Sequence, residues 1–132
     1  MDATMVLMEF VRFESPTPNR RGAHIGIFGL ANGLAHRDLL SGQDREWLAF
    51  SNAWGDAAYT DPATVDAIFD KAVHPLATCW FKSTAEHLLL QVSGYLDLLD
   101  RYGVEWREQR SADPGRRIYE DDVQVVVVPH RI

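Results

Sequence analysis

The segment 83–103 constrains the fold more than any other part of the chain. Ser83 and Glu86 have the spacing of a capping box, in which each side chain bonds the other residue's free backbone donor at a helix start. Apolar residues then recur along one helical face, at Ala85, Leu88, Leu89, Val92, Leu96 and Leu99. Gly103 favours the left-handed conformation that ends a helix. The sequence therefore predicts an amphipathic helix that buries one face against another element.

Segments of strand character flank this helix on both sides. Residues 76–82 form a short apolar run, and residues 104–110 begin with alternating apolar and polar side chains. Two strands joined by a helix predict a parallel pair with a right-handed crossover. A turn at residues 113–115 then leads into a closing hairpin, broken at Asp121 and Asp122. Residues 125–128 are apolar on both faces, which is typical of a strand inside a sheet.

The first half of the chain predicts one strand followed by three helices. Residues 5–13 are rich in β-forming side chains, and two prolines end this strand. Helical periodicity covers residues 23–40 and 43–58, and a shorter helix is expected to begin at Asp61 and bury Val65, Ile68, Phe69 and Ala72.

Two features of these helices bear on packing. Four glycines recur within residues 22–33, and they leave open whether this stretch is helix or loop. In the second helix, Trp47, Phe50 and Trp54 share one face and are expected to lie in the core. The predicted fold class is α+β. We expect a mixed sheet of four to five strands, with a C-terminal strand-helix-strand-hairpin unit and an inserted three-helix segment, in a single domain over residues 1–132.

Composition restricts the class of protein and its partners. The chain has 132 residues and is 46% hydrophobic, which suits one folded domain with a sizeable core. It carries 13 Lys and Arg against 19 Asp and Glu, a formal charge of −6. This acidic balance argues against nucleic acid and anionic membranes as partners, and favours a basic or neutral partner.

Cysteine usage and the N-terminus indicate a cellular compartment. Cys79 is the single cysteine, so an intramolecular disulfide is impossible. Asp2 stands where a signal peptide needs basic residues, and no apolar run reaches the roughly 18–20 residues of a membrane span. We therefore expect a soluble, cytoplasmic protein.

Two stretches of the second half have a familiar sequence. The first is Trp80-Phe81-Lys82 followed by a helix that ends in Tyr102-Gly103-Val104. The second is Asp113-Pro114-Gly115 followed by the run Tyr-Glu-Asp-Asp-Val-Gln-Val-Val from Tyr119. Together they resemble a group of small uncharacterised bacterial proteins found mainly in actinomycetes. The resemblance covers roughly the last 60 residues, and it implies a shared fold but no particular chemistry.

Candidate ligand-binding residues fall at two places. Arg20 and Arg21 precede the first predicted helix, where backbone donors and arginines favour an anion. Lys82 ends a predicted strand next to a helix start, with Trp80 as an apolar wall, and it is also placed to hold an anion. The alternatives are a mobile basic loop for the arginines and an ion pair with a nearby carboxylate for Lys82.

Candidates for catalysis are weaker. Lys82 as base or nucleophile, with His36, His87 or Tyr119 as proton-transfer partners, is the best available set. Cys79 lies in an apolar strand and is expected to be a core residue. The five histidines lack metal-ligand spacing, and the acidic cluster at residues 120–122 is more typical of a solvated turn. No metal and no cofactor are expected.

Two functions of different class fit these observations. The first is a non-catalytic interaction module, such as an inhibitor, an immunity-type protein or a regulatory accessory protein, which binds another protein through an acidic and aromatic surface. The second is a small enzyme or a binding protein for an anionic small molecule, with a pocket between the sheet and the helical insertion. The second hypothesis requires Lys82 and at least one histidine to converge on that pocket.

Overall fold

The computed structural model describes residues 9–65, 69–70 and 72–130. The strands are β1 (Phe10–Glu14), β2 (Thr78–Lys82), β3 (Arg107–Ser111), β4 (Arg116–Glu120) and β5 (Gln124–Val128). The helices are α1 (Ile27–His36), α2 (Gly42–Ala58) and α3 (Glu86–Arg101), with a short 3-10 turn at Pro62–Thr64. The predicted α+β class is confirmed, with five strands in one sheet.

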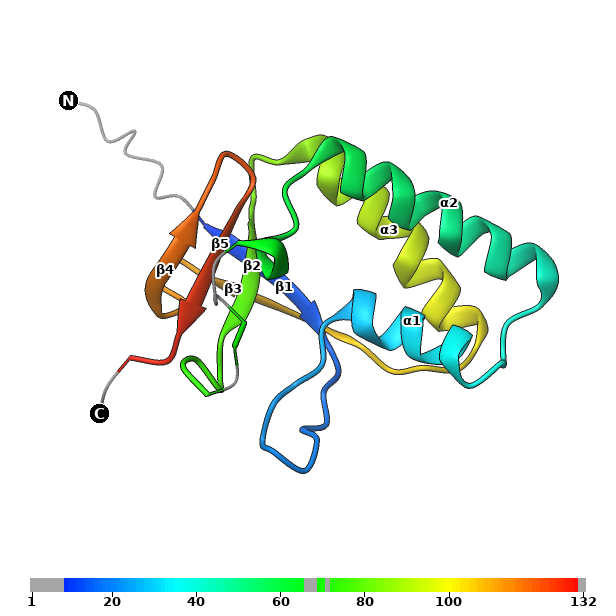
Figure 1. Ribbon diagram of the computed structural model, residues 1–132, viewed down its shortest axis with the longest axis horizontal. Coiled ribbons are helices and arrows are strands. Elements are labelled where there is room, and N and C mark those ends of the chain that lie inside the picture. The colour runs from blue at the N-terminus through cyan, green and yellow to red at the C-terminus, as the bar shows by residue number, and fades with distance from the viewer. Residues whose placement is uncertain (1–8, 66–68, 71, 131–132) are drawn as a thin grey trace.

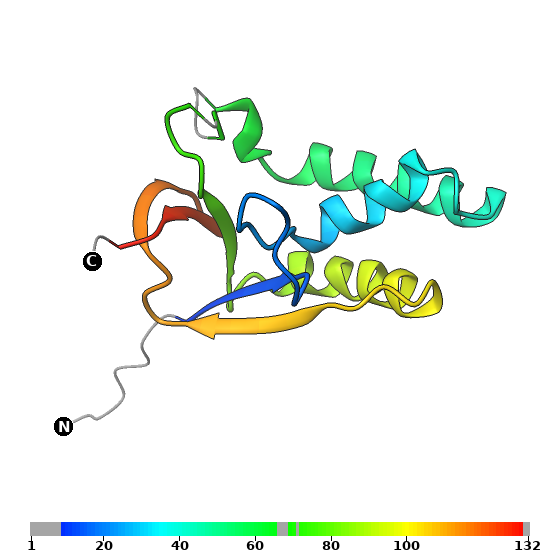
Figure 2. The ribbon, with the colours of Figure 1, turned by 90° about the horizontal axis from the view of Figure 1, so that it is seen from below.

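The three helices gather on one side of the sheet, as Figures 1 and 2 show. α1 and α2 both pack on α3 and on each other. The core between helices and sheet includes Val11, Ile27, Phe81, Val92, Tyr95 and Leu98. A smaller cluster on the opposite face of the sheet consists of Phe10, Val125 and Val127. Among the described residues, no helix combines the length and apolar character needed to cross a membrane.

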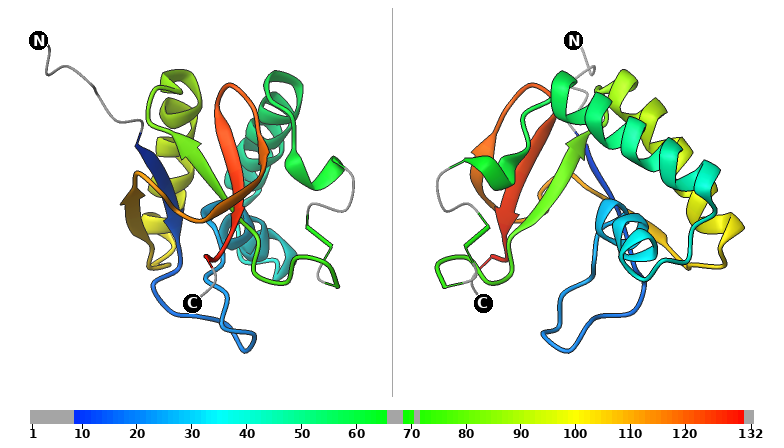
Figure 3. Two further views of the ribbon diagram at one scale, coloured as in Figure 1. Left: turned by 90° about the vertical axis from the view of Figure 1, so that its left-hand side faces the viewer. Right: turned by 45° about the vertical axis from the view of Figure 1, so that its right-hand side comes forward.

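The strand order is β3-β1-β2-β5-β4, and every neighbouring pair is antiparallel. The sheet is therefore not mixed, which corrects the expected parallel pair. β2 and β3 do run in the same direction, but β1 lies between them and pairs with both (Figure 3). Phe10 and Val11 are buried on opposite faces of β1, and a strand that is apolar on both faces is stable only inside a sheet. The predicted hairpin of β4 and β5 is confirmed, with all of β5 buried.

The start of α3 differs from the prediction, whereas its end agrees. The backbone N–H of Ser83 donates to the Glu9 carbonyl, so the chain is still held by the sheet at this residue. The helix begins three residues later, after Ala85, and no side chain caps it. The expected capping box is therefore wrong. At the other end Gly103 has φ of 70°, and the N–H of Val104 donates to the Leu99 carbonyl, which is the predicted glycine-terminated end.

The glycine-rich stretch is partly loop and partly helix. Gly22 has φ of 79° in a turn, and α1 begins only after Gly26. Of the third predicted helix, the described residues form a 3-10 turn, which Asp61 caps by accepting from the N–H of Ala63. The expected inward position of Ile68 lies outside the described residues.

The aromatic face of α2 is largely on the surface, so the prediction that it lies in the core is wrong for Phe50 and Trp54, whereas Trp47 is half-buried and packs against the core. Phe50 is 72% exposed and Trp54 is 42% exposed, and α2 buries Leu48 and Ser51 instead. This exposure results from the position of α2 in the helical layer. It packs against α1 and α3 on the outside of the helical layer, so a smaller share of its surface is covered than periodicity implies.

Candidate ligand-binding cavity

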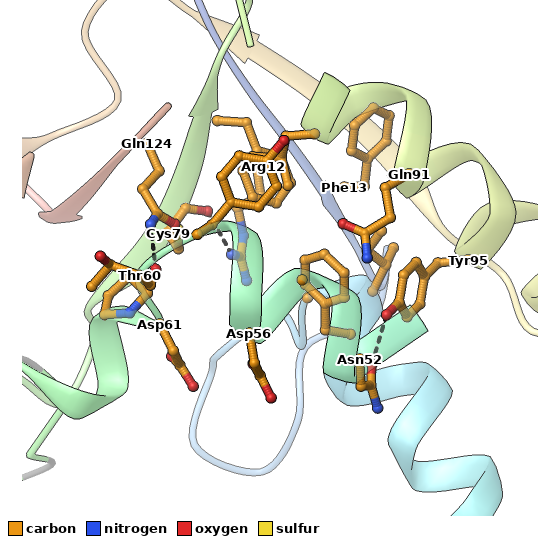
Figure 4. A pocket seen from close by; sticks show the side chains of 18 of the residues that line it. Arg12, Phe13, Asn52, Asp56, Thr60, Asp61, Cys79, Gln91, Tyr95 and Gln124 are labelled. Carbon is orange, nitrogen blue, oxygen red and sulfur yellow. Dashed lines mark hydrogen bonds between the residues drawn. The ribbon is translucent and has the colours of Figure 1, made fainter. Parts of the chain in front are cut away.

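A cavity of about 400 Å³ opens between the helices and the helix-facing side of the sheet. Side chains from all three helices and from β1, β2 and β5 line it, and Figure 4 shows them converging on one space. This volume falls within the usual range for sites that hold small organic molecules.

The cavity exists because β1 and β2 separate. The two strands are in register only at Phe10 with Lys82 and at Val11 with Phe81, whereas β1 pairs with β3 along its whole length. Arg12 fills the gap that follows, and its Nη1 donates to the backbone carbonyl of Cys79 at 3.0 Å. A side chain replaces part of the strand ladder here and forms one wall of the cavity.

Buried ion pairs hold the Arg12 guanidinium in place. Its side chain is only 11% exposed, and its other nitrogens donate to Glu14 at 2.6 Å and to the His24 carbonyl at 2.8 Å. Glu14 also accepts from Arg107 at 2.6 Å. Burial raises the pKa of Glu14, but the hydrogen bonds and charges of Arg107 and Arg12 outweigh it, so this pKa lies below its ordinary value of 4.5.

Gln124 fixes the opposite wall. Its Nε2 donates to the Thr60 carbonyl at 2.7 Å and to Asp121 at 3.0 Å, and its Oε1 accepts from the Cys79 thiol at 3.2 Å. Burial raises the pKa of Cys79 to about 12. The thiol therefore stays protonated at neutral pH and is not available as a nucleophile.

A chain of hydrogen bonds runs along the helical side. The Tyr95 hydroxyl donates to Asn52 at 2.6 Å, and Asn52 donates to Asn32 at 2.9 Å. Gln91 donates to the Ser51 carbonyl at 2.7 Å. Burial raises the pKa of Tyr95 to about 12, so its hydroxyl remains a donor. These bonds tie α1, α2 and α3 together around the cavity.

Aromatic rings make up much of the remaining lining. Phe28 stands edge-on to Tyr95, with ring centroids 4.7 Å apart, and edge-on to Phe81 at 6.0 Å. Other rings reach the cavity from β1, from the end of α2 and from the segment that precedes β2: Phe13, Tyr59 and Phe69. Such walls favour flat or apolar groups and offer ring faces to a cation.

The charged groups at the mouth are acidic. Asp56, near the C-terminal end of α2, and Asp61, just beyond it, are exposed and line the cavity. Arg12 is the cationic side chain among the described lining residues, and all three of its nitrogens already donate to protein oxygens. The cavity thus presents negative charge to a ligand.

Lys82 and Trp80, two of the expected ligand-binding residues, lie away from this cavity. Side chains alternate along a strand, and Cys79 and Phe81 of β2 face the cavity, so Trp80 and Lys82 face the other side of the sheet. There Lys82 pairs with Glu120 at 2.7 Å. This is the ion pair that the alternative interpretation of Lys82 expected.

The remaining expected site residues are scattered. Arg20 and Arg21 are exposed in a loop closed by Asn19, whose side chain accepts from the Arg21 and Ala23 N–H groups. His36 is exposed at the end of α1, and His87 lies on the outer surface of α3. The structure therefore brings none of these residues to the cavity and does not assemble Lys82 with a histidine.

The polar side chains of the β4–β5 hairpin are engaged in hydrogen bonds within the hairpin itself. The Tyr119 hydroxyl donates to Asp121 at 2.7 Å, and Asp121 also accepts from the N–H groups of Val123 and Gln124. Burial would raise the pKa of Asp121, but these hydrogen bonds outweigh it and lower the pKa. Within the part of the chain that the structure describes, no three His, Cys, Asp or Glu side chains are grouped to hold a metal ion.

Sequence reasoning missed the polar residues that do line the cavity. Arg12 lies between apolar residues of β1, Gln124 begins the otherwise apolar β5, and a buried polar residue in such a strand needs a partner. That signal was available. For Asn52 and Gln91 no signal was available, because polar positions on predicted helices are usually solvated.

Comparisons with models of protein families, with curated proteins and with solved structures find no match to this chain. The resemblance to the actinomycete group stays an expectation. Function is therefore argued from the cavity itself.

Proposed function

We propose that this protein binds a small organic molecule, cationic or uncharged, in the cavity between its helices and its sheet. The observation that carries the proposal is the sign of the available charge. Arg12 is engaged by three protein oxygens, whereas the carboxylates of Asp56 and Asp61 stand exposed at the mouth. Carboxylates near an apolar space attract a cation and repel an anion. This reverses the sign of ligand expected from Lys82 and the arginine loop.

The lining supports an aromatic or aliphatic ligand with one polar end. Phe28, Phe81 and Tyr95 form adjoining ring surfaces inside the cavity, and Asp56 lies at its mouth. A primary amine on a short aromatic or aliphatic stem would bury its stem against the rings and keep its ammonium beside the carboxylates.

Binding is favoured over catalysis. The described lining contains no lysine, histidine or serine, and the raised pKa of Cys79 keeps its thiol protonated. Covalent catalysis requires an activated nucleophile beside a base, and the lining supplies carboxylates from Asp56 and Asp61 but no such nucleophile among the residue types just named. We therefore propose ligand capture as the activity of the protein, and from the single cysteine we propose the cytoplasm as its compartment.

Three probes that share one phenylethyl group test the proposal, because their polar ends carry positive, zero and negative charge. They are 2-phenylethylamine, 2-phenylethanol and 3-phenylpropionate. We expect the amine to stabilise the protein most, the alcohol less, and the carboxylate not at all. At about ten times its dissociation constant the amine adds roughly 1.4 kcal/mol, which raises Tm by about 5 °C. Thermal unfolding measures this, and equal stabilisation by the carboxylate, or none by amine and alcohol, contradicts the proposal.

A matched pair of variants locates the effect. Asp56→Asn removes one exposed carboxylate from the cavity mouth, so the Tm shift with the amine should fall towards that with the alcohol. Asp122→Asn removes an equal charge from the exposed hairpin and should leave the shift unchanged. Identical losses in both variants would show that net charge, and not the cavity, governs binding.

A further inference from the structure

α2 and α3 enclose a second hollow, on the outer side of the helical layer. We name this hollow the α2–α3 groove. It has a volume of about 400 Å³, with Trp47, Phe50 and Trp54 from α2 facing Leu90 and Gly94 from α3. Gln91 lines both this groove and the cavity, and its side chain donates to the Ser51 carbonyl.

The floor of the α2–α3 groove is closely packed. The Trp47 ring lies so close to Gly94 that a Cβ on that glycine would stand 2.6 Å from the Trp47 Cζ2. Trp47 also stands edge-on to the buried Tyr95, with ring centroids 5.3 Å apart. The hollow is therefore built into the packing of the two helices and is not a chance gap between mobile side chains.

The walls of the α2–α3 groove are apolar and open to solvent. Phe50 is 72% exposed and Leu90 is 71% exposed, one on each helix, and Trp54 adds a third large side chain. Single exposed apolar residues are ordinary on a protein surface, but several lining one hollow are typical of an interaction site.

Acidic side chains border these walls. Helical spacing places Glu46 one turn before Phe50, and Glu86 one turn before Leu90, on the same helix faces. Asp97 extends the α3 border and pairs with Arg101, which also binds Asp44. Among the described residues that line the groove, His87 is the one ionisable side chain, and none is a lysine or an arginine. The groove is therefore an apolar channel with a negative border.

We propose that the α2–α3 groove docks an amphipathic helix of another protein, with lysines or arginines flanking its apolar face. Seven residues separate Trp47 from Trp54, a rise of about 10 Å, which matches the span from the first to the eighth residue of a helix. Charge complementarity selects a basic partner. A second copy of this chain would set one acidic border against another, with −6 on each chain. This inference is independent of the small-molecule site.

Selection from displayed random peptides of about 14 residues, roughly four turns of helix, tests the inference with the intact chain. The enriched peptides should carry apolar residues at helical spacing with lysine or arginine beside them, and should become helical when bound. Phe50→Ser and Leu90→Ser should each weaken the binding of such a peptide about tenfold or more. Both positions are exposed, so neither change removes core packing.

Two further variants separate the groove from general surface effects. Leu39→Ser changes an apolar residue that is 53% exposed and lies outside the groove, so it should leave affinity unchanged. Glu46→Gln should lower affinity about threefold and reduce its salt dependence, while Glu105→Gln should do neither. The inference is overturned if no peptide is enriched, if enriched peptides are acidic, or if they bind Phe50→Ser equally well. It is also overturned if sedimentation shows a dimer that Phe50→Ser dissociates.

Discussion

Glu14 is buried at the last position of β1 and joins two arginines that come from different strands. Because its pKa is lowered in the folded protein, Glu14 contributes stability above its ordinary pKa of 4.5 and loses that contribution as pH falls through the lowered value. Arg12 would be left with an unpaired buried charge if Glu14 were neutral. The Glu14 carboxylate thus links β1 to β3 through Arg107 and fixes Arg12 in the cavity wall.

Glu14→Gln should lower the unfolding free energy at pH 7 by about 3 kcal/mol, the usual cost of breaking a buried ion pair. The difference from the wild type should shrink below pH 4.5, as Glu14 itself becomes protonated. Urea unfolding at pH 7 and at successively lower pH measures this. A difference that stays constant as the pH falls would show that the charge of Glu14 contributes nothing.

At the scale of elements, local signals predicted where α3 ends but not where it begins. Gly103 ends the helix through its own backbone conformation. Ser83, in contrast, is held in the sheet by a backbone hydrogen bond to Glu9, a residue far away in sequence. α2 shows the same limit. Its periodicity was correctly interpreted as helical, but periodicity alone cannot tell which apolar face meets the core. The sequence for that reason predicts core packing where the structure has the groove.

Gly94 is a point of close contact between α3 and α2, against the Trp47 ring. Alanine is the better helix former by about 1 kcal/mol, yet Gly94→Ala should destabilise the protein by about 1–3 kcal/mol, because the added Cβ displaces the Trp47 ring. Gly33→Ala in α1, where the added Cβ meets nothing within 4 Å beyond its chain neighbours and the nearby backbone of its own helix, should instead stabilise it by about 0.5–1 kcal/mol. Chemical denaturation of both variants checks this, and equal effects would contradict the packing described.

At the scale of the whole molecule, composition and pattern predicted the α+β class and five strands within the expected range. Strand order could not be predicted, because it depends on which distant segments pair. The placement of β1 between β2 and β3 is the clearest example. The cavity is a consequence of that order, since it opens where β1 leaves β2 and where residues of all three helices meet. Local sequence patterns do not reveal which distant residues the strand order brings together.

Backbone amide chemical shifts, followed by NMR as 2-phenylethylamine is added, test the central claim most directly. The account predicts saturable shifts concentrated on cavity residues such as Phe28, Asp56 and Gln124, with none from 3-phenylpropionate at equal concentration. Shifts spread over the surface, or a carboxylate that perturbs the cavity while the amine does not, would contradict it.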